Sequence, residues 1–320
     1  MSEPAPGPPP VVALDGLPPT PHVVSVGTFD GVHLGHRHLL RGAVARGREL
    51  GLPVAAVTFE PLPPAVLRPD RFAGRICTPA EKLAAIGATG VDAIAVVPFT
   101  LAFSRTSPER FMADLAAAAR LRELWVGEGF ALGKDRAGDV PRLTEIGRGL
   151  GFAVVALPRL TLDGETVSSS EVRRALLAGE VRRAWACLGR PHRVEGTVVH
   201  GKKVGRTIGF PTANLLPPAD LVPLADGIYA SWAWLDDDVA PRPAVTYIGR
   251  RPTVNTGERA IETHLLDFDG DLYGRHLQVD LLEHLRPDEN FPTLDALVAQ
   301  MGTDRANARR VHAEVAAAAG

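Results

Sequence analysis

Short apolar runs alternate with longer amphipathic stretches over the first half of the chain. The apolar runs, which we expect to form strands, are Val23–Val26, Val54–Phe59, Ala93–Val97, Leu124–Val126 and Ala153–Leu157. The stretches between them, which we expect to form helices, are Leu34–Leu50, Pro79–Ala88, Pro108–Arg120 and Pro141–Gly149. Continuous apolar strands that alternate with helices are typical of a parallel sheet covered on both faces. The pattern therefore predicts an α/β domain over residues 21–188.

The pattern changes after a helical segment at Ser168–Leu188, in which Gly179 is a possible break. Five later runs alternate apolar and polar residues between Gly, Pro and Asp turns: Arg193–His200, Gly227–Leu235, Ala244–Ile248, Ala260–Phe268 and His276–Leu285. Short strands at this spacing predict a small antiparallel β-barrel, followed by a terminal helix at Leu294–Ala318. We therefore expect a second domain over residues 189–320 and a flexible tail over residues 1–20.

Composition narrows the class of protein. The 320 residues are 45% apolar and 22% charged, and a net charge of -2 argues against a general nucleic-acid binder. Two distant cysteines, Cys77 and Cys187, exclude a disulfide scaffold and fit a reducing cytoplasm. The sequence contains neither a secretory signal pattern nor an apolar stretch of membrane-spanning length. We expect a cytoplasmic protein with no nucleic-acid or membrane partner, and the oligomeric state stays open.

The segment Gly27–His36 follows the first predicted strand and opens the first predicted helix. His33 and His36 lie three residues apart, so both can face one phosphate at the helix N-terminus and donate hydrogen bonds to it. Glycines allow the backbone to approach a ligand closely. The candidate phosphate-binding residues here are Gly27, Phe29, Gly31 and Gly35. A loop with two surface histidines is the alternative, and the glycine-flanked H-x-x-H pattern favours the phosphate site.

A second helix start, at Val167–Arg173, carries three serines and an arginine one turn later. Hydroxyl groups and amides at a helix N-terminus, together with a guanidinium, suit nucleotide phosphates. A simple N-terminal serine cap explains the segment equally well when it is taken alone, but the upstream histidines favour the nucleotide. The candidates are Ser169, Ser170 and Arg173.

A glycine-rich segment in the second half, Gly205–Asn214, carries the most specific pattern in the chain. Thr212 and Asn214 project to one side of an extended segment, and their oxygens are the ligands that Mg²⁺ prefers. The candidates for phosphate binding are Gly205, Arg206, Thr207, Gly209 and Pro211. A glycine-rich hairpin would account for the glycines, but not for Arg206, Thr212 and Asn214 together.

The predicted strand Ala260–Phe268 places Glu262 and His264 on one side and apolar residues on the other. A carboxylate at a barrel mouth, opposite a nucleotide and its metal, is a candidate general base. Spacing alone does not exclude a surface glutamate on an edge strand. For His264, a structural role and a catalytic role both stay open.

These segments carry a family resemblance. Gly27–His36 resembles the G-x-F-D-G-x-H-x-G-H signature of nucleotidyltransferases, in the form found in bacterial bifunctional riboflavin kinase/FAD synthetases. Gly205–Asn214 matches the G-R-T-x-G-F-P-T-A-N motif of riboflavin kinases without a mismatch. The other segments that resemble the family are Thr58–Pro61, Val126–Gly138, Val167–Arg173, Glu262–Phe268 and Asp269–Gly274.

The resemblance implies a Rossmann-like nucleotidyltransferase domain followed by a riboflavin-kinase barrel. It implies ATP, riboflavin and FMN as substrates and Mg²⁺ as the metal. Glu262 would activate the 5′-hydroxyl of riboflavin, and Thr212 and Asn214 would hold the metal. In the first domain, His33 and His36 would act with Ser169 and Arg173 to stabilise the transfer of AMP to FMN.

The chain departs from the family at two positions in the first domain. Leu62 stands where the family usually has histidine, and Gly129 stands where it usually has aspartate or asparagine. Ser170 in place of threonine is a milder change. The leading hypothesis is an enzyme with both activities. A riboflavin kinase with an impaired adenylyltransferase domain and a non-catalytic flavin or nucleotide sensor are the alternatives.

Overall fold

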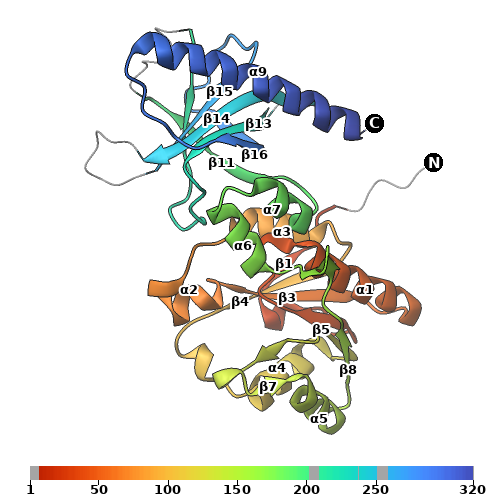
Figure 1. Cartoon of the computed structure of the whole chain (residues 1–320). Coiled ribbons are helices and arrows are strands. Elements are labelled where there is room, and N and C mark those ends of the chain that lie inside the picture. Colours follow the sequence, from red (N-terminus) through yellow and green to blue (C-terminus); the bar gives the residue numbers. More distant parts are fainter. Residues whose placement is uncertain (1–6, 202–208, 237, 251–258, 320) are drawn as a thin grey trace, which may run out of the picture. The chain divides into compact units, whose positions relative to one another are not determined.

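A computed structural model divides the chain into two units, Met1–Ser169 and Ser170–Gly320 (Figure 1). It describes residues 7–201, 209–236, 238–250 and 259–319. We expected the domain boundary near Gly189. The division into units falls earlier in the chain, so the helical segment before Gly189 groups with the second unit. The boundary near Gly189 stays a prediction. Among the helices of these ranges, none combines the length and the apolar character needed to cross a bilayer.

The first unit is built on a six-stranded parallel sheet, which confirms the predicted α/β fold. In spatial order the strands are β1 (Val11–Val12), β4 (Ala93–Pro98), β3 (Val54–Glu60), β2 (Val23–Val26), β5 (Glu123–Gly127) and β8 (Ala153–Leu157). Because all strands run in one direction, their carboxyl ends meet at one edge of the sheet.

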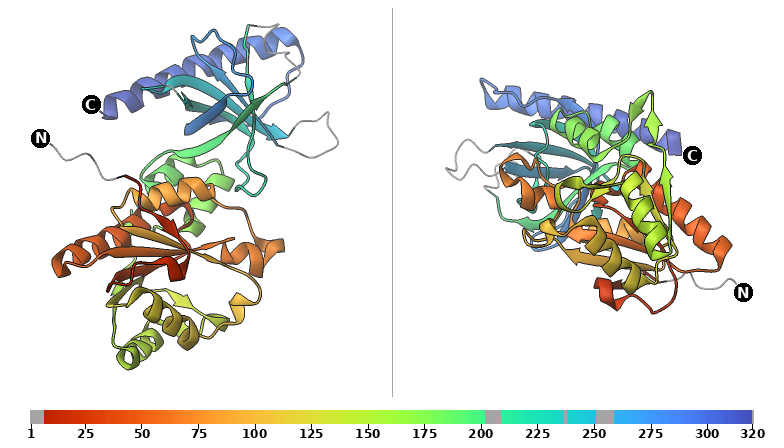
Figure 2. Two further views of the ribbon diagram at one scale, coloured as in Figure 1. Left: turned by 180° about the vertical axis from the view of Figure 1, so that it is seen from behind. Right: turned by 90° about the horizontal axis from the view of Figure 1, so that it is seen from below.

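Helices cover both faces of this sheet (Figures 1 and 2). They are α1 (Leu34–Leu50), α3 (Pro79–Gly87), α4 (Pro108–Ala119) and α5 (Val140–Leu150). The short helix α2 (Pro63–Leu67) follows β3 and has no buried residue. One core lies between the sheet and α1 and α3, and the other lies between the sheet and α4 and α5. Thr78, Ser107 and Asp139 cap the last three helices, each of which has proline in its first turn.

Short elements complete the first unit. They are the hairpin of β6 (Ala131–Leu132) and β7 (Gly138–Asp139), the hairpin of β9 (Thr161–Leu162) and β10 (Glu165–Thr166), and the 3-10 turns Leu14–Gly16, Asp30–Val32, Pro69–Arg71, Phe103–Arg105 and Lys134–Arg136. None of these was expected from the sequence, because two or three residues are too few to carry a periodic pattern.

Part of the segment expected to be a flexible tail lies in the sheet. Val11 and Val12 pair with Ile94 and Ala95 at the sheet edge, and Leu17 is buried. A two-residue strand is stabilised by its neighbour and by burial, not by local propensity. Residues 7–20 are therefore partly ordered, whereas residues 1–6 lie outside the described ranges.

The second unit is a closed barrel, as the sequence predicts, and its strands pair in antiparallel fashion. In spatial order the strands are β11 (His192–Val199), β12 (Ala213–Leu216), β15 (Arg259–Leu265), β14 (Arg242–Arg250), β13 (Gly227–Leu235) and β16 (His276–Arg286). The helices of this unit are α6 (Ser169–Leu177), α7 (Val181–Leu188) and α9 (Leu294–Ala319). The break between α6 and α7 falls at Gly179, which has a positive φ.

The barrel has a buried polar centre and a covered outer face. Inside, the hydroxyl groups of Ser231, Thr246 and Thr263 form a hydrogen-bonded chain across three strands. Outside, α9 lies along the barrel (Figures 1 and 2) and buries Ala308 and Val311 against it. The outward residues of the covered strands therefore face a helix rather than solvent.

Helix α5 offers a matched test of the first core. Leu143 is fully buried in the core beneath α4 and α5, whereas Leu150 on the same helix is 45% exposed. Leu143→Ala is expected to lower the free energy of unfolding by about 2–5 kcal/mol, because it leaves a cavity. Leu150→Ala is expected to change it by less than about 0.5 kcal/mol. Denaturant unfolding of both variants checks this, and equal effects would contradict the described core.

Candidate active sites

A strained turn joins β2 to α1. Phe29, Gly31 and Val32 all have positive φ, at 48°, 77° and 40°. Positive φ costs little at glycine, but it is unfavourable at phenylalanine and more so at β-branched valine. Such strain persists only where surrounding contacts hold it, and it concentrates at functional sites. The turn is therefore fixed by its neighbours.

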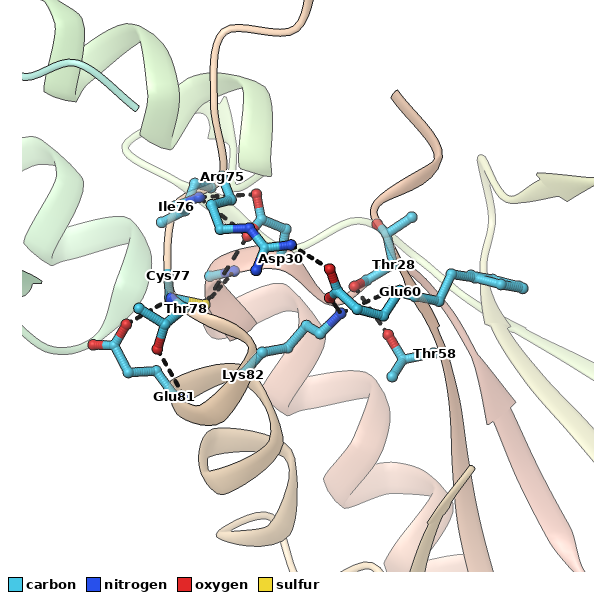
Figure 3. A network of polar contacts seen from close by, with 12 residues as sticks. Thr28, Asp30, Thr58, Glu60, Arg75, Ile76, Cys77, Thr78, Glu81 and Lys82 are labelled. Atoms are coloured by element: carbon cyan, nitrogen blue, oxygen red, sulfur yellow. Dashed lines mark hydrogen bonds and ion pairs between the residues drawn. The ribbon is translucent and has the colours of Figure 1, made fainter. Parts of the chain in front are cut away.

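Asp30 ties this turn to two other segments (Figure 3). Its carboxylate, 2% exposed, accepts hydrogen bonds from the Ile76 N–H at 3.0 and 3.1 Å. Its backbone oxygen accepts a hydrogen bond from the Ser169 hydroxyl at 3.0 Å. The adjacent Gly31 N–H donates to Cys77 Sγ at 3.3 Å, and a side chain at Gly31 would clash with Ile76. Contacts with residues 75–77 thus hold the turn in its conformation.

A second part of the same network lies at the end of β3 (Figure 3). The Glu60 carboxylate pairs with Arg75 and, at 3.0 Å, with Lys82 of α3, and both cations are almost fully buried. Lys82 also donates to the Phe59 carbonyl at 2.9 Å, and the Thr58 hydroxyl donates to the Thr28 carbonyl at 3.1 Å. Removing one partner of such a buried group leaves the remaining charges unpaired, which lowers the free energy of unfolding. The network holds the edges of β2, β3 and α3 together.

The two histidines of the turn stack on each other, with ring centroids 3.6 Å apart. The His36 backbone N–H donates to His33 Nδ1 at 3.3 Å, so that nitrogen carries no proton. Burial lowers the pKa of His33 to about 4, and burial together with His33 holds the pKa of His36 well below its usual value. At neutral pH His33 is therefore uncharged and carries its proton on Nε2 as a hydrogen-bond donor. Nδ1 of His36 is buried with no partner among the described residues.

A pocket of about 340 Å³, here called the histidine pocket, opens beside these rings. Its polar and predicted lining residues are Gly27, Thr28, Phe29, His33, Gly35, His36, His38, Gly129, Arg136, Arg159, Thr166 and Ser168. It thus brings three of the four predicted phosphate-site positions, Gly27, Phe29 and Gly35, together with both histidines. The fourth, Gly31, packs on Ile76 instead. Thr28, Arg136, Arg159 and Ser168 were not predicted.

A larger pocket of about 950 Å³, the phenylalanine pocket, shares Thr28, Phe130, Ala131 and Arg136 with the histidine pocket. One wall consists of Phe59, Phe99, Phe103 and Phe111, whose neighbouring rings lie 5.6–6.3 Å apart. Its basic residues are Arg68, Arg105, Lys134 and Arg136. The sequence analysis missed this pocket. The signal that could have revealed the pocket is the presence of phenylalanines at or just after the carboxyl ends of β3 and β4.

The two departures from the family pattern have different surroundings. The Leu62 side chain is buried and lies at the start of α2, so it belongs to the core rather than to either pocket. Gly129 lines the histidine pocket. Of the predicted phosphate-binding residues on α6, Ser169 bonds to the turn, and Ser170 and Arg173 belong to the second unit. Helix periodicity places Ser169 and Arg173, four residues apart, on one face of α6.

Strand register assembles the candidate site on the barrel. Asn214 of β12 lies opposite Glu262 of β15, so their side chains share a face of the sheet. The Thr212 hydroxyl lies 3.4 Å from the Glu262 carboxylate. The alternation of buried and half-buried residues in β15 directs Thr263 inward and Glu262 outward. The predicted carboxylate therefore lies on the outer face of the barrel wall, not inside the barrel.

Two pockets meet at Thr212. The mouth pocket, about 480 Å³, includes Gly201, Asn214, Asp269 and Tyr273. The helix pocket, about 340 Å³, lies between the outer wall and α9 and includes Tyr247, Glu262, Phe291 and Met301. A side chain on Gly201 would lie 2.7 Å from Asn214 Cγ, so glycine is needed there. Two ligands, one in each pocket, could therefore both approach Thr212.

His264 supports this site. Its Nδ1 donates to the Pro211 carbonyl at 2.8 Å, directly before Thr212, and its ring packs edge-on against Phe210. Burial lowers the pKa of His264, which favours the neutral ring. Gly209 has a φ of 84° at the turn before Phe210. Gly205, Arg206 and Thr207 lie outside the described residues.

The described ranges contain no group of three or more His, Cys, Asp or Glu side chains able to hold a metal ion. A metal at Thr212 and Asn214 would therefore take most of its ligands from a bound nucleotide and from water. The donor types fit Mg²⁺, which prefers oxygen ligands and keeps several waters.

Comparison with known proteins places the two units in named families. Residues 18–171 match the family model described as FAD synthetase, and residues 188–312 match the one described as riboflavin kinase. The bifunctional riboflavin kinase/FMN adenylyltransferase of Escherichia coli strain K12 is 40% identical over 288 residues, covering 90% of this chain and 91% of that protein. The proteins of that name from Pseudomonas fluorescens and Bacillus subtilis are 39% and 33% identical, over 91% and 90% of this chain and 93% and 92% of their own.

A solved structure resembles the whole chain. It is described as a macrolide-efflux protein from Streptococcus pneumoniae, a description that belongs to that protein. Its TM-score is 0.84 at 29% identity, and the match covers 93% of this chain and 97% of the other.

The buried histidine makes a testable contribution to stability. A histidine with a lowered pKa in the folded protein binds fewer protons than it does when unfolded, so stability present above pH 6.5 is lost as the pH falls toward 4. Between pH 7 and pH 5, His33 is expected to cost the first unit about 2 kcal/mol. His33→Asn keeps an N-cap acceptor and should remove that part of the pH dependence. Hydrogen exchange of the β2 and β3 amides measures it, and an unchanged dependence would refute the assignment.

Proposed function

Because the chain belongs to the family of bifunctional riboflavin kinase/FMN adenylyltransferases, we propose that it makes FAD in two ATP-dependent steps. The barrel unit phosphorylates riboflavin to FMN, and the α/β unit transfers AMP from ATP to FMN. The observation that carries this proposal is that two family models, one for each activity, cover successive parts of a chain that is 40% identical to a bifunctional relative over 90% of its length.

In the kinase step, Glu262 takes the proton of the riboflavin 5′-hydroxyl. The hydroxyl oxygen bonds to the γ-phosphorus of ATP, and ADP leaves. The position of Glu262 supports this role, because its carboxylate lines the helix pocket and lies beside the Thr212 hydroxyl. The aromatic and apolar residues Tyr247, Phe291 and Met301 of that pocket suit the flavin ring.

The mouth pocket suits the ATP phosphates of this step, with Thr212 and Asn214 as the residues that would hold Mg²⁺. The ion would neutralise charge on the transferred phosphate. Thr212 lines both pockets, which puts a metal-binding hydroxyl between the two substrates. His264 acts on this site as a positioning residue through the Pro211 carbonyl. Arg206, Thr207 and the glycines of the same motif are proposed to cover the phosphates, by resemblance alone.

In the adenylyl step, a phosphate oxygen of FMN bonds to the α-phosphorus of ATP, and pyrophosphate leaves. Neutral His33, together with His36, donates hydrogen bonds to the charge that develops on the transferred phosphate. Ser169 and Arg173, on one face of α6, and Ser170 bind the nucleotide phosphates at that helix start. The glycines at 27, 31 and 35 and the Phe29 turn give the chain the shape that presents both histidines.

The phenylalanine pocket suits the FMN of this step. Its aromatic wall matches a flat ring system, and its basic residues match a phosphate group. Thr28 and Arg136 belong to both pockets, so the reacting phosphates would meet beside them. The alternative of a kinase without adenylyltransferase activity loses part of its basis, because Leu62 lies in the core and not in either pocket. A pure sensor would have no need of a carboxylate placed like Glu262.

The two reactions are tested directly by product analysis. Purified protein incubated with riboflavin, ATP and Mg²⁺ is expected to yield FAD, with FMN as the intermediate, resolved by chromatography. FMN that accumulates without FAD would reduce the function to the kinase step. Absence of any product would favour the sensor.

Glu262→Gln separates the two sites. The amide cannot accept the hydroxyl proton as a carboxylate does, so FMN formation is expected to fall by about 100-fold or more. Conversion of added FMN to FAD is expected to continue at the wild-type rate, because the other unit carries it out. Kinase activity that survives the change would exclude Glu262 as the base.

A further inference from the structure

Gly129 makes room for an arginine. A side chain on Gly129 would place its first carbon 3.0 Å from Arg159 Cζ and closer still to Nη2. The guanidinium of Arg159 thus fills the space that the aspartate or asparagine side chain usual at this position would enter. The φ of Gly129 lies outside the left-handed region, so its backbone does not demand glycine. The atoms that a side chain at this position would meet belong to the guanidinium of Arg159.

The arginine is held over Gly129 by the pairing of two strand ends. Gly127 of β5 pairs with Leu157 of β8, and the Glu128 N–H donates to the Leu157 carbonyl at 2.8 Å. The Glu128 carboxylate accepts a hydrogen bond from the Arg159 backbone N–H at 3.3 Å and lies 3.9 Å from Nε. Glu128 therefore faces the Nε side of the guanidinium, while Nη2 extends over Gly129.

Arg159 changes the charge of the histidine pocket. Among the described residues that line this pocket, none is an aspartate or a glutamate. His33 and His36 are uncharged at neutral pH because the pKa of each is lowered. The arginines in its lining are Arg136 and Arg159, which both approach Gly129, since Arg136 Nη2 donates to the Gly129 carbonyl at 3.4 Å. These two arginines are the guanidinium groups that the described lining offers to a bound polyanion.

We propose that Arg159 binds a substrate phosphate group in the histidine pocket, in the space opened by Gly129. This inference rests on the proposed adenylyl transfer. A guanidinium offers paired N–H donors that match phosphate oxygens, and a cation here offsets the charge that the neutral histidines leave uncompensated. The chain therefore replaces an acidic or amide side chain by a basic one at the same place. The phosphate is that of ATP or that of FMN.

The test measures adenylyl transfer in Arg159→Gln with FMN and ATP varied separately. The KM for the substrate whose phosphate Arg159 contacts is expected to rise about 10-fold or more, since hydrogen bonds to charged groups are worth that much. A rise for ATP alone assigns the nucleotide phosphate, and a rise for FMN alone assigns the flavin phosphate. Arg159→Lys keeps the charge but not the paired donors. Its KM for that substrate should lie between the values of the wild type and of Arg159→Gln.

Controls separate binding from folding. Riboflavin phosphorylation by the same variant reports on the other unit and is expected to stay at the wild-type rate. Arg148→Gln removes an exposed arginine on α5 outside the pocket and should leave both KM values unchanged. Thermal unfolding of Arg159→Gln is expected to match the wild type, because the side chain is 57% exposed.

A second variant tests the space itself. Gly129→Asn must displace the guanidinium, so it is expected to raise the same KM as Arg159→Gln. The double variant should have nearly the same KM as either single variant, because both changes remove the same contact between Arg159 and the phosphate. Unchanged KM values in Arg159→Gln, with wild-type FAD formation intact, would overturn the proposal and leave the proposed function standing. Wild-type protein that makes FMN but no FAD would overturn both.

Discussion

Strand pairing is the constraint on which both sites depend. In the first unit, parallel pairing of β2 with β3 and β5 brings the ends of these strands to one edge, where the histidine turn, Glu60 and Gly129 all follow. In the second unit, the antiparallel register of β12 with β15 sets Asn214 opposite Glu262. A shift of one residue in that register would turn one of the two side chains to the other face of the wall.

The first site keeps a strained backbone in place by burying polar contacts around it. Asp30 bonds to residue 76 and to Ser169, and Glu60 links Arg75 to Lys82. These contacts lie beside the pocket and not in it. The histidines that they position are neutral, and the arginines that line the same pocket lie on separate loops.

The two proposed reactions place different demands on the protein. A riboflavin hydroxyl must lose its proton to attack phosphorus, and Glu262, which lines the helix pocket, is the carboxylate proposed for that step. A phosphate oxygen of FMN is already anionic and needs no base, and the described lining of the histidine pocket includes no carboxylate.

The sequence by itself determined the order of the longer strands and helices, the two fold classes and the local motifs. Periodicity fixed long elements such as α1 to the residue, because burial of one face imposes a regular pattern. Glycine and histidine spacing identified the turn before α1, and the Thr212–Glu262 association followed from resemblance. Short elements such as β1 carry no such pattern and were missed. Only tertiary structure decided what occupies the space above Gly129, because Arg159 lies 30 residues away in sequence and reaches it through the pairing of β5 with β8. Only the closed barrel decided that Glu262 faces α9, because that depends on which side of a curved wall each residue of a strand faces.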